Sequence, residues 1–359
     1  MKIQKLKLSN FRNQKSKLFT FSPEITVILG PNASGKTNIL EAIDFLSTGK
    51  SFRAKIEEEM VNYNSDISRI KGRIKIDSEI VDLEAILTRG SIDIGSQRPE
   101  KVARKKLLVN GISKRLIDFA GKFRIVLFGP EDLELVTETP TLRRRFLDSV
   151  LSQVDREYRR ALLSYEKGLR QRNRLLLRIR DEGLSRSQLL FWDRLLIKNG
   201  DYLSSKRAEF IDYANKTSPV NDLTFKLEYD KSAISEARLE QYSEEEVAAT
   251  TTLVGPHRDD FSFKIVSNGN KFDRDLSRFG SRGEQRMGIL WLKLVELSFI
   301  EEKTNEKPTL LLDDIFSELD SKHRKIVVKV IKNQQTIITT ADPLYVKQFK
   351  KVEKIILKQ

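Results

Sequence analysis

The sequence contains no cysteine among its 359 residues. This absence excludes structural disulfides and thiolate metal sites, and it fits a reducing compartment, so we expect the cytoplasm. Long apolar runs are also missing. The most apolar stretch, Ile289 to Ile300, is interrupted by Lys293 and Glu296, whereas a membrane span needs about 20 apolar residues. The first eight residues carry lysines but no continuous apolar stretch, so we do not expect a signal peptide.

The chain has fewer acidic than basic residues. The 65 Lys and Arg residues outnumber the 51 Asp and Glu residues, which gives a formal net charge of +14 and a pI of about 9.6. Such a surplus favours a polyanionic partner, with nucleic acid as the first expectation and an anionic membrane as the second. At 39% hydrophobic and 32% charged residues, the chain has the composition of a soluble globular protein with a substantial core.

A complete phosphate-binding loop of the form G-x-x-x-x-G-K-[ST] occupies residues 30–37. The apolar run 25–29 before it predicts a buried strand, and apolar residues at helical spacing follow it in 38–46. Glycines let the backbone wrap a phosphate, the lysine is expected to reach the β- and γ-phosphates, and the threonine hydroxyl to hold Mg²⁺. The predicted ligands are ATP and Mg²⁺, and the predicted binding residues are Gly30, Pro31, Asn32, Ala33, Ser34, Gly35, Lys36, Thr37 and Asn38.

A second motif lies near the far end of the sequence. Residues 309–314 read Thr-Leu-Leu-Leu-Asp-Asp, an apolar strand whose tip carries two acids. Carboxylates in such a place are costly unless they are paired or bound to a metal. Asp313 is expected to complete the Mg²⁺ site with Thr37, and Asp314 to polarise the attacking water. Lys36 and Asp314 are therefore the candidate catalytic residues.

The spacing of the two motifs predicts the domain organisation. They are separated by 314 − 36 = 278 residues, far more than a compact P-loop domain needs. We therefore predict an α/β protein in which residues 1–127 and 305–359 form an ATP-binding lobe and residues 128–304 form an inserted, mainly helical lobe. In the first lobe, alternating runs such as 70–76 and 80–87 predict strands, and Asn110-Gly111 predicts a hairpin turn.

The inserted lobe begins with a helical pattern. Apolar residues recur at steps of three and four from Leu147 to Leu169, which predicts one helix from Thr141 that ends near Gly183. A second helix follows from about Ser187 towards Tyr213. The two form a helical hairpin over about 141–215, too short for a long coiled-coil arm. The segment 239–252, rich in Glu, Ala and Thr, is the best candidate for a mobile connection.

Several short segments of the sequence resemble the RecF family of bacterial recombination-mediator ATPases, which are related to the heads of SMC proteins. The segments are spread over nearly the whole chain and occur in the same order as in the family. Besides the two motifs above, the resemblance depends on the segments 8–13 (LSNFRN), 50–53 (KSFR), 126–133 (VLFGPEDL), 142–148 (LRRRFLD), 165–173, 255–260 (GPHRDD), 280–286 (GSRGEQR) and 311–320 (LLDDIFSELD).

The resemblance implies an ABC-type head that works as an ATP-gated dimer. The segment 280–286 is similar to the ABC signature, and Ser281 with the backbone at Gly283 would meet the γ-phosphate held by a second subunit. Taken without its neighbours, this segment would be better interpreted as a turn that caps a helix. Arg12 would be a nucleotide contact from the first strand, and Ser317 to Asp320 would lie along the dimer interface.

Three positions depart from the family pattern. Phe128 stands where a glutamine is usual, so Glu131 or Asp132 would sense the metal-bound nucleotide. The catalytic glutamate position holds Asp314, one methylene shorter, which suggests slow hydrolysis because the carboxylate must reach the water. No switch histidine is present, since the chain contains only His257 and His323. Thr340 or Asp342 would take its place.

The function that the resemblance implies is recombinational DNA repair and DNA replication, with RecO and RecR as partners, in placing RecA at single-strand gaps and in SOS induction. ATP would close the dimer on duplex or junction DNA, and slow hydrolysis would release it. DNA contact should be independent of sequence and sensitive to salt. Charge clustering gives the candidate DNA contacts Arg104, Lys105, Lys106, Arg143, Arg144, Arg170 and Arg172.

Other functions stay open at this point. An SMC-like head that bridges chromosomal chains without enzymatic turnover is one alternative, although the short hairpin argues against it. An ABC transporter ATPase would need a membrane partner, and a small-molecule P-loop kinase would not need the signature-like segment 280–286.

Overall fold

The computed structural model describes residues 1–92, 100–217, 220, 223–266, 273–318, 321–349 and 352–358. The chain divides into two compact units, Met1–Glu131 with Glu296–Gln359 (unit 1) and Asp132–Val295 (unit 2). The first segment of the ATP-binding lobe was expected to end at residue 127, which is 131 − 127 = 4 residues before the end of the first segment of unit 1. The second segment was expected to begin at residue 305, which is 305 − 296 = 9 residues after the point where unit 1 resumes. The second difference arises because one helix, α10 (Arg282–Thr304), continues without a break from unit 2 into unit 1.

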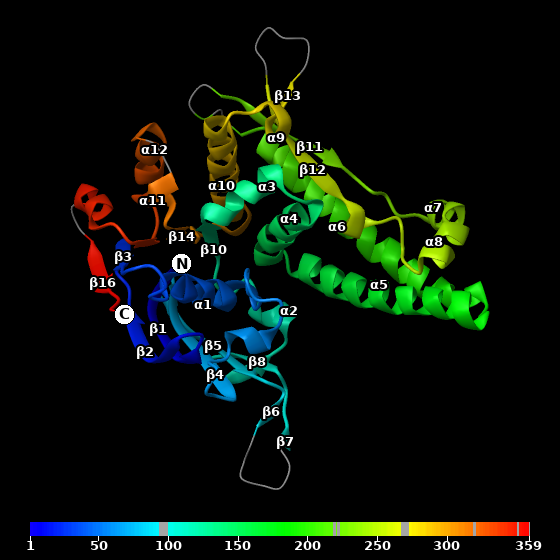
Figure 1. The fold of residues 1–359 in the computed structure, drawn as a ribbon, viewed down its shortest axis with the longest axis horizontal. Helices are drawn as coiled ribbons and strands as arrows, with labels where there is room; N and C mark the ends of the chain where they lie inside the picture. The colour runs from blue at the N-terminus through cyan, green and yellow to red at the C-terminus, as the bar shows by residue number, and fades with distance from the viewer. Residues whose placement is uncertain are drawn as a thin grey trace. The chain divides into compact units, whose positions relative to one another are not determined.

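Unit 1 contains a five-stranded sheet in which all strands are parallel (Figure 1). Its central strands are almost wholly buried, as expected for a parallel sheet that is covered on both faces, and β3 and β14 consist mainly of apolar residues. The strands predicted at 25–29 and 309–312 are both present. The spatial order is β10 (Ile125–Phe128), β14 (Thr309–Asp313), β15 (Thr336–Thr340), β3 (Ile25–Leu29) and β16 (Glu353–Ile356).

A second sheet of unit 1 has six antiparallel strands, so the lobe contains two sheets of different type. Burial alternates along β4, with one face in the core and the other in solvent. The predicted turn at Asn110-Gly111 is confirmed, with φ values of 50° and 79° that suit these two residues. The spatial order is β2 (Gln14–Thr20), β1 (Lys2–Phe11), β4 (Ile67–Ile76), β5 (Glu79–Thr88), β8 (Lys105–Val109) and β9 (Ile112–Lys114).

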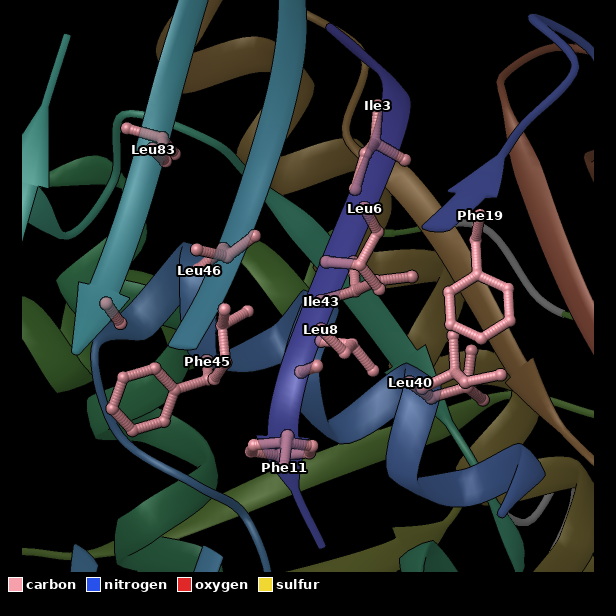
Figure 2. Packing of buried hydrophobic residues seen from close by; sticks show 14 of the residues in the cluster. Ile3, Leu6, Leu8, Phe11, Phe19, Leu40, Ile43, Phe45, Leu46 and Leu83 are labelled. Atoms are coloured by element: carbon pink, nitrogen blue, oxygen red, sulfur yellow. The ribbon is translucent and has the colours of Figure 1, made fainter. Parts of the chain in front are cut away.

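Helix α1 (Lys36–Thr48) joins the two sheets into one core. Ten of its thirteen residues are buried, and its hydrophobic cluster includes side chains from both sheets. Figure 2 shows Ile3, Leu6 and Leu8 of β1 beside Leu40 and Ile43 of α1. The phosphate-binding loop is thus fixed to a helix that is held from both sides. The remaining elements of unit 1 are η1 (Glu57–Met60), β6 (Ser91–Ile92), β7 (Glu100–Lys101), α2 (Leu116–Phe119), α11 (Ile315–Glu318), α12 (Ser321–Ile331) and η5 (Pro343–Gln348).

In unit 2, the single helix predicted from Thr141 is wrong. The chain forms α4 (Pro140–Val154) and then α5 (Arg156–Glu182), with a break at Asp155. The Asp155 backbone is extended, and its carboxylate accepts hydrogen bonds from the backbone N–H groups of Glu157 and Tyr158. Asp155 therefore caps a new helix, a role that apolar spacing does not reveal. The predicted end of the helix is confirmed, since Gly183 adopts a φ of 67° directly after α5.

The hairpin itself consists of α5 and α6 (Leu190–Asn215), which contact each other along their length. The other elements of unit 2 form a small antiparallel sheet and several short helices. These are α3 (Glu134–Thr137), η3 (Arg186–Leu189), β11 (Phe225–Asp230), α7 (Glu236–Gln241), α8 (Ser243–Ala249), η4 (Pro256–Arg258), β12 (Asp260–Ile265), β13 (Arg274–Asp275) and α9 (Leu276–Phe279); η2 (Pro130–Leu133) crosses the boundary between the units.

The segment 239–252 is not the connection that its composition suggested. It forms most of α7 and α8, and Leu239, Glu246 and Thr252 are buried. Glu246 pairs with Arg172 of α5 at 2.7 Å between Oε2 and an Nη atom, which anchors α8 to the hairpin. Among the described helices of both units, none has the combination of length and apolar character that a membrane crossing requires.

Candidate nucleotide-binding site

The phosphate-binding loop connects β3 to α1 and adopts a strained backbone. Ala33 has a φ of 64° and Gly35 a φ of 93°, both in the left-handed region. Gly35 is the N-cap of α1, where no side chain caps the helix and the first turn contains no acidic residue. The N–H groups at the start of this long helix therefore carry partial positive charge without a built-in anion. This geometry suits a phosphate group.

Close neighbours surround the two glycines of the loop. A Cβ atom on Gly35 would lie 2.6 Å from side-chain atoms of Asn13 and Gln14, and one on Gly30 would lie 2.6 Å from Ser34 Oγ. The Ser34 hydroxyl is buried, and it has no hydrogen-bond partner among the described residues. A buried hydroxyl normally has a partner. The loop therefore combines an uncapped helix start with an unsatisfied buried hydroxyl, and a bound phosphate could accept hydrogen bonds from both.

Lys36 and Thr37 occupy the first turn of α1. The Lys36 ammonium group donates to the carbonyl oxygens of Gly30 and Pro31 at 2.8 and 2.9 Å, so the lysine lies over the loop. Thr37, the next residue, is half-buried. Asn38 Nδ2 donates to Asn13 Oδ1 at 3.0 Å. Pro31, Asn32 and Ala33 form the exposed tip of the loop. All nine predicted loop residues thus lie together at the end of β3.

Asp313 and Asp314 lie at the same edge of the parallel sheet. β15 separates β14 from β3, and the carboxyl ends of all three strands point the same way. Thr339 Oγ1 donates to Asp313 Oδ1 at 2.6 Å, while the backbone N–H of Asp314 donates to the carbonyl and the hydroxyl of Thr339. Asp314 has a φ of 49°, a conformation that turns the chain out of the strand. Thr339, which the sequence did not indicate, thus binds the Asp313 carboxylate and the Asp314 backbone.

Arg12 lies in the turn between β1 and β2 and binds α1. Its guanidinium group makes two hydrogen bonds to the Glu41 carboxylate, at 3.0 and 2.6 Å, and a third to the Glu59 carbonyl. Glu41 is fully buried, and it also accepts from Ser51 at 2.6 Å. The donors of Arg12 are therefore used in holding the β1–β2 turn beside the loop. The resemblance implied a nucleotide contact by Arg12 from the first strand, whereas the structure places Arg12 just after that strand, with its guanidinium group bound to Glu41. The structure also places Asn13 against Gly35.

The signature-like segment caps α10 in unit 2. Ser281 Oγ accepts from the backbone N–H of Glu284 at 3.2 Å, and Glu284 accepts in return from the N–H of Ser281 at 2.7 Å. This reciprocal pair is a capping box. These hydrogen bonds keep the pKa of Glu284 below its ordinary value. Ser281 and Gly283 are exposed, and a Cβ atom on Gly283 would meet only Ser281 Oγ, at 3.9 Å. The segment therefore caps α10 and at the same time exposes Ser281 and Gly283.

The positions that depart from the family pattern have defined partners. Phe128 is buried at the end of β10, and Asp132 forms an ion pair with Lys293 at 2.9 Å, so that carboxylate has a structural role within unit 2. Thr340 is buried opposite Leu29 at the entrance of the phosphate-binding loop. Asp342 accepts from the N–H of Leu344 at 2.8 Å. Leu319 and Asp320 of the interface segment lie outside the described residues.

The structure separates the candidate DNA contacts into two groups. Arg143 and Arg172 are buried, with ion pairs to Asp260 and to Asp193 and Glu246, so we no longer expect them to contact DNA. Lys105 is largely used too, since it binds Glu57 at 2.7 Å and lies over the Phe45 ring. Of the others, Lys106 and Arg170 are exposed, Arg104 is exposed but paired with Glu58, and Arg144 is half-buried and donates to the Asp259 carbonyl.

Comparisons with known proteins agree with this geometry. Residues 2–359 match the family model described as RecF/RecN/SMC N terminal domain. A DNA replication and repair protein RecF from Herpetosiphon aurantiacus is 35% identical over 368 residues, which cover 95% of this chain and 94% of that protein. A protein of the same name from Lachnoclostridium phytofermentans is 37% identical over 350 residues, which cover 94% of this chain and 92% of that protein.

Solved structures give the same result. The recombination mediator protein RecF with ATP, of the RecFOR pathway, is 32% identical, with a TM-score of 0.82 over 95% of this chain and 92% of that chain. An SMC head bound to the C-winged helix domain of ScpA has a TM-score of 0.52 at 17% identity over 99% of this chain and 94% of that one, a likeness of fold alone. The chain therefore belongs to the RecF/RecN/SMC N terminal domain family, and within it to the RecF proteins, which confirms the family and the ABC-type head fold that the sequence predicts.

Proposed function

We propose that this RecF protein binds Mg-ATP and acts on DNA in replication and recombinational repair. The observation that carries the proposal is the grouping of Lys36, Thr37, Asp313 and Asp314 at one edge of the parallel sheet, beside an uncapped helix N-terminus. In open α/β sheets, ligands bind outside the carboxyl ends of the strands. The names and bound nucleotide of the relatives support the same conclusion.

Each residue has a role that its position supports. The Lys36 ammonium group would exchange its loop carbonyls for phosphate oxygens, and the Ser34 hydroxyl and the α1 N–H groups would donate to them. Thr37 and Asp313 supply oxygen ligands of the kind that Mg²⁺ takes. Bound Mg²⁺ would neutralise phosphate charge. Asp314, whose backbone N–H binds Thr339, would accept a proton from the attacking water. Its short side chain supports slow turnover.

The exposed signature segment supports an ATP-gated homodimer. Ser281 and Gly283 are accessible in unit 2, and their own capping bonds keep the backbone in place. We propose that they complete the nucleotide site of a second copy of the chain. ATP would then act as a conformational ligand that favours the closed dimer, and DNA affinity would be coupled to closure. Partners of the RecO and RecR kind, RecA placement at single-strand gaps, SOS induction and a cytoplasmic location belong to the same proposal.

A mixing experiment tests the composite site. Lys36→Met removes the phosphate-binding lysine, and Ser281→Arg blocks the signature, so neither variant alone should dimerise with Mg-ATP. In a mixed dimer, one site would combine an intact loop with an intact signature. We expect sedimentation velocity with Mg-ATP to show dimers in the equimolar mixture but not with either variant alone. Lys55 is an exposed lysine of the same unit, and the control variant Lys55→Met should dimerise as wild type does. Dimerisation of Ser281→Arg alone would refute the composite site.

A further inference from the structure

The outer face of the six-stranded sheet carries an unusual arrangement of charge. The register of β1 and β4 places Lys2 opposite Lys75, Lys5 opposite Arg73, and Lys7 opposite Lys71. A bulge between Ile3 and Lys5 makes this possible, because it shifts the alternation so that the lysines on either side of it point outward. Like charges directly opposite one another destabilise an antiparallel pair. Three such pairs in succession point to an anionic partner.

Few acids neutralise this face. Asp82 of β5 lies 2.9 Å from Arg73 and 3.6 Å from Lys71, and Glu84 lies 3.8 Å from Arg69. The structure pairs neither Lys5 nor Lys7 with a carboxylate of the described chain. Eight basic and two acidic residues give 8 − 2 = +6. We name this set the basic sheet face: Lys2, Lys5, Lys7, Arg69, Lys71, Arg73, Lys75 and Lys106, with Asp82 and Glu84.

The geometry of the face matches a charged backbone. Same-face residues along a strand are about 6.8 Å apart, and neighbouring strands are about 4.8 Å apart. Duplex DNA carries about one phosphate per strand for every 3.4 Å of helix axis. Because the sheet backbone that carries these side chains is already in place, the face can meet several phosphates without a rearrangement of the chain. The opposite face of the same sheet packs in the core against α1, so the basic side chains are directed to solvent.

We propose that the basic sheet face binds the phosphate backbone of duplex DNA. The inference rests on the proposed function and deepens it, because it assigns the DNA contact to strands β1 and β4 of unit 1, where charge clustering along the sequence did not place it. Lys106 of β8, opposite Ile86, is the one residue that belongs both to this face and to the candidates from the sequence. An anionic membrane is the other surface that such a face could meet, and the test separates the two.

The test compares two double variants of the same sheet. Lys5→Glu/Lys7→Glu reverses two charges on the basic sheet face. Lys17→Glu/Lys114→Glu is the matched control, because these exposed edge-strand lysines lie opposite Leu8 and Leu107 and therefore belong to the other side of the sheet. Fluorescence anisotropy with a labelled duplex should show about tenfold weaker binding for the first variant and wild-type binding for the control. The salt dependence, log K against log salt, should lose about two units of slope.

Stability provides an independent check on this comparison. Lys5→Glu and Lys7→Glu create opposite-charge pairs with Arg73 and Lys71, so the thermal midpoint should stay the same or rise while DNA binding falls. If the variant unfolds, Lys5→Gln/Lys7→Gln should show a smaller loss in the same direction. Equal binding by both glutamate variants would overturn the proposal.

The remaining outcomes separate this proposal from its neighbours. If Lys5→Glu/Lys7→Glu loses binding to phosphatidylserine vesicles but keeps its affinity for the duplex, the face is a membrane surface and the proposal is wrong. If wild type binds no duplex with or without Mg-ATP, the proposed DNA-binding function itself is wrong, whatever the role of the basic sheet face. Wild-type binding that only the control variant weakens would move the contact to the other side of the sheet.

Discussion

At the scale of single residues, two arginines two positions apart have opposite roles. Arg172 is buried on α5, where it binds Asp193 at 2.6 Å and Glu246 at 2.7 Å, whereas Arg170 is exposed. The sequence places both in one basic cluster. Their difference depends on Glu246, which is 246 − 172 = 74 residues away, and no local pattern encodes a contact over that distance. The loop residues 30–38, in contrast, could be predicted because their chemistry lies within one short motif.

Replacement of Arg172 should therefore affect folding before it affects binding. Arg172→Ala leaves the fully buried Glu246 carboxylate without its cation, and removal of one partner of a buried pair lowers the free energy of unfolding by about 3 to 5 kcal/mol. Arg170→Ala should change it by less than about 0.5 kcal/mol. Urea unfolding monitored by circular dichroism measures both. A stable Arg172→Ala variant that has lost only DNA binding would show that Arg172 is a DNA contact after all.

At the scale of elements, the turn at Gly255–Arg258 connects the hairpin to the sheet of unit 2. Gly255 has a φ of 125°, and a Cβ atom there would lie 2.3 Å from the Tyr165 hydroxyl. His257 Nε2 lies 2.9 Å from the Thr252 carbonyl, which can only accept, so Nε2 carries the proton and Nδ1 accepts from Tyr165 at 2.8 Å. The neutral imidazole is thus built into the turn, which supports a structural rather than a catalytic role.

This histidine should make the stability of the protein depend on pH. Burial lowers the pKa of His257 to about 4, against 6.5 for the free side chain. The folded state then binds fewer protons than the unfolded state below pH 6.5, so the stabilisation is complete above that pH and is lost as the pH falls towards 4. Between pH 7.5 and pH 5 the free energy of unfolding should fall by about 2 kcal/mol from this group.

His257→Gln provides the comparison for that prediction. The glutamine amide can form hydrogen bonds but cannot titrate, so the variant should be less stable than wild type at pH 7.5 and should lose less stability on acidification. Urea midpoints at both pH values measure the difference. The same pH dependence in both proteins would contradict the role assigned to His257.

Sequence patterns predicted the type of most elements but not all of their limits. The buried strands 25–29 and 309–312 could be predicted because continuous apolar runs specify a strand buried on both faces. The break at Asp155 was missed because apolar spacing continues through it, and the capping bonds of its carboxylate are a matter of backbone geometry. The helices α7 and α8 were missed because the composition of 239–252 hides one buried glutamate among exposed ones.

At the scale of the whole molecule, the pairing of distant strands decides the site. β14, which carries Asp313, and β3, which leads to the phosphate-binding loop, are 309 − 29 = 280 residues apart in sequence, yet only β15 lies between them in the sheet. The motif spacing indicated that a large insertion separates the two halves of the nucleotide-binding lobe. It did not indicate Thr339 as the residue that positions both acids, because a strand neighbour is visible only in the register. The outward register of β1 and β4 was hidden for the same reason.

The central claim is that ATP at the loop of one protomer closes a dimer. Light scattering with Mg-ATP, with and without a short duplex, tests it on wild type, Lys36→Met and Asp314→Asn. We expect wild type to shift from monomer to dimer, Lys36→Met to stay monomeric because it loses the phosphate contact, and Asp314→Asn to stay dimeric because hydrolysis no longer resets it. If all three proteins stay monomeric with every nucleotide and DNA, the dimer account is wrong, and the loop serves a reaction within one subunit.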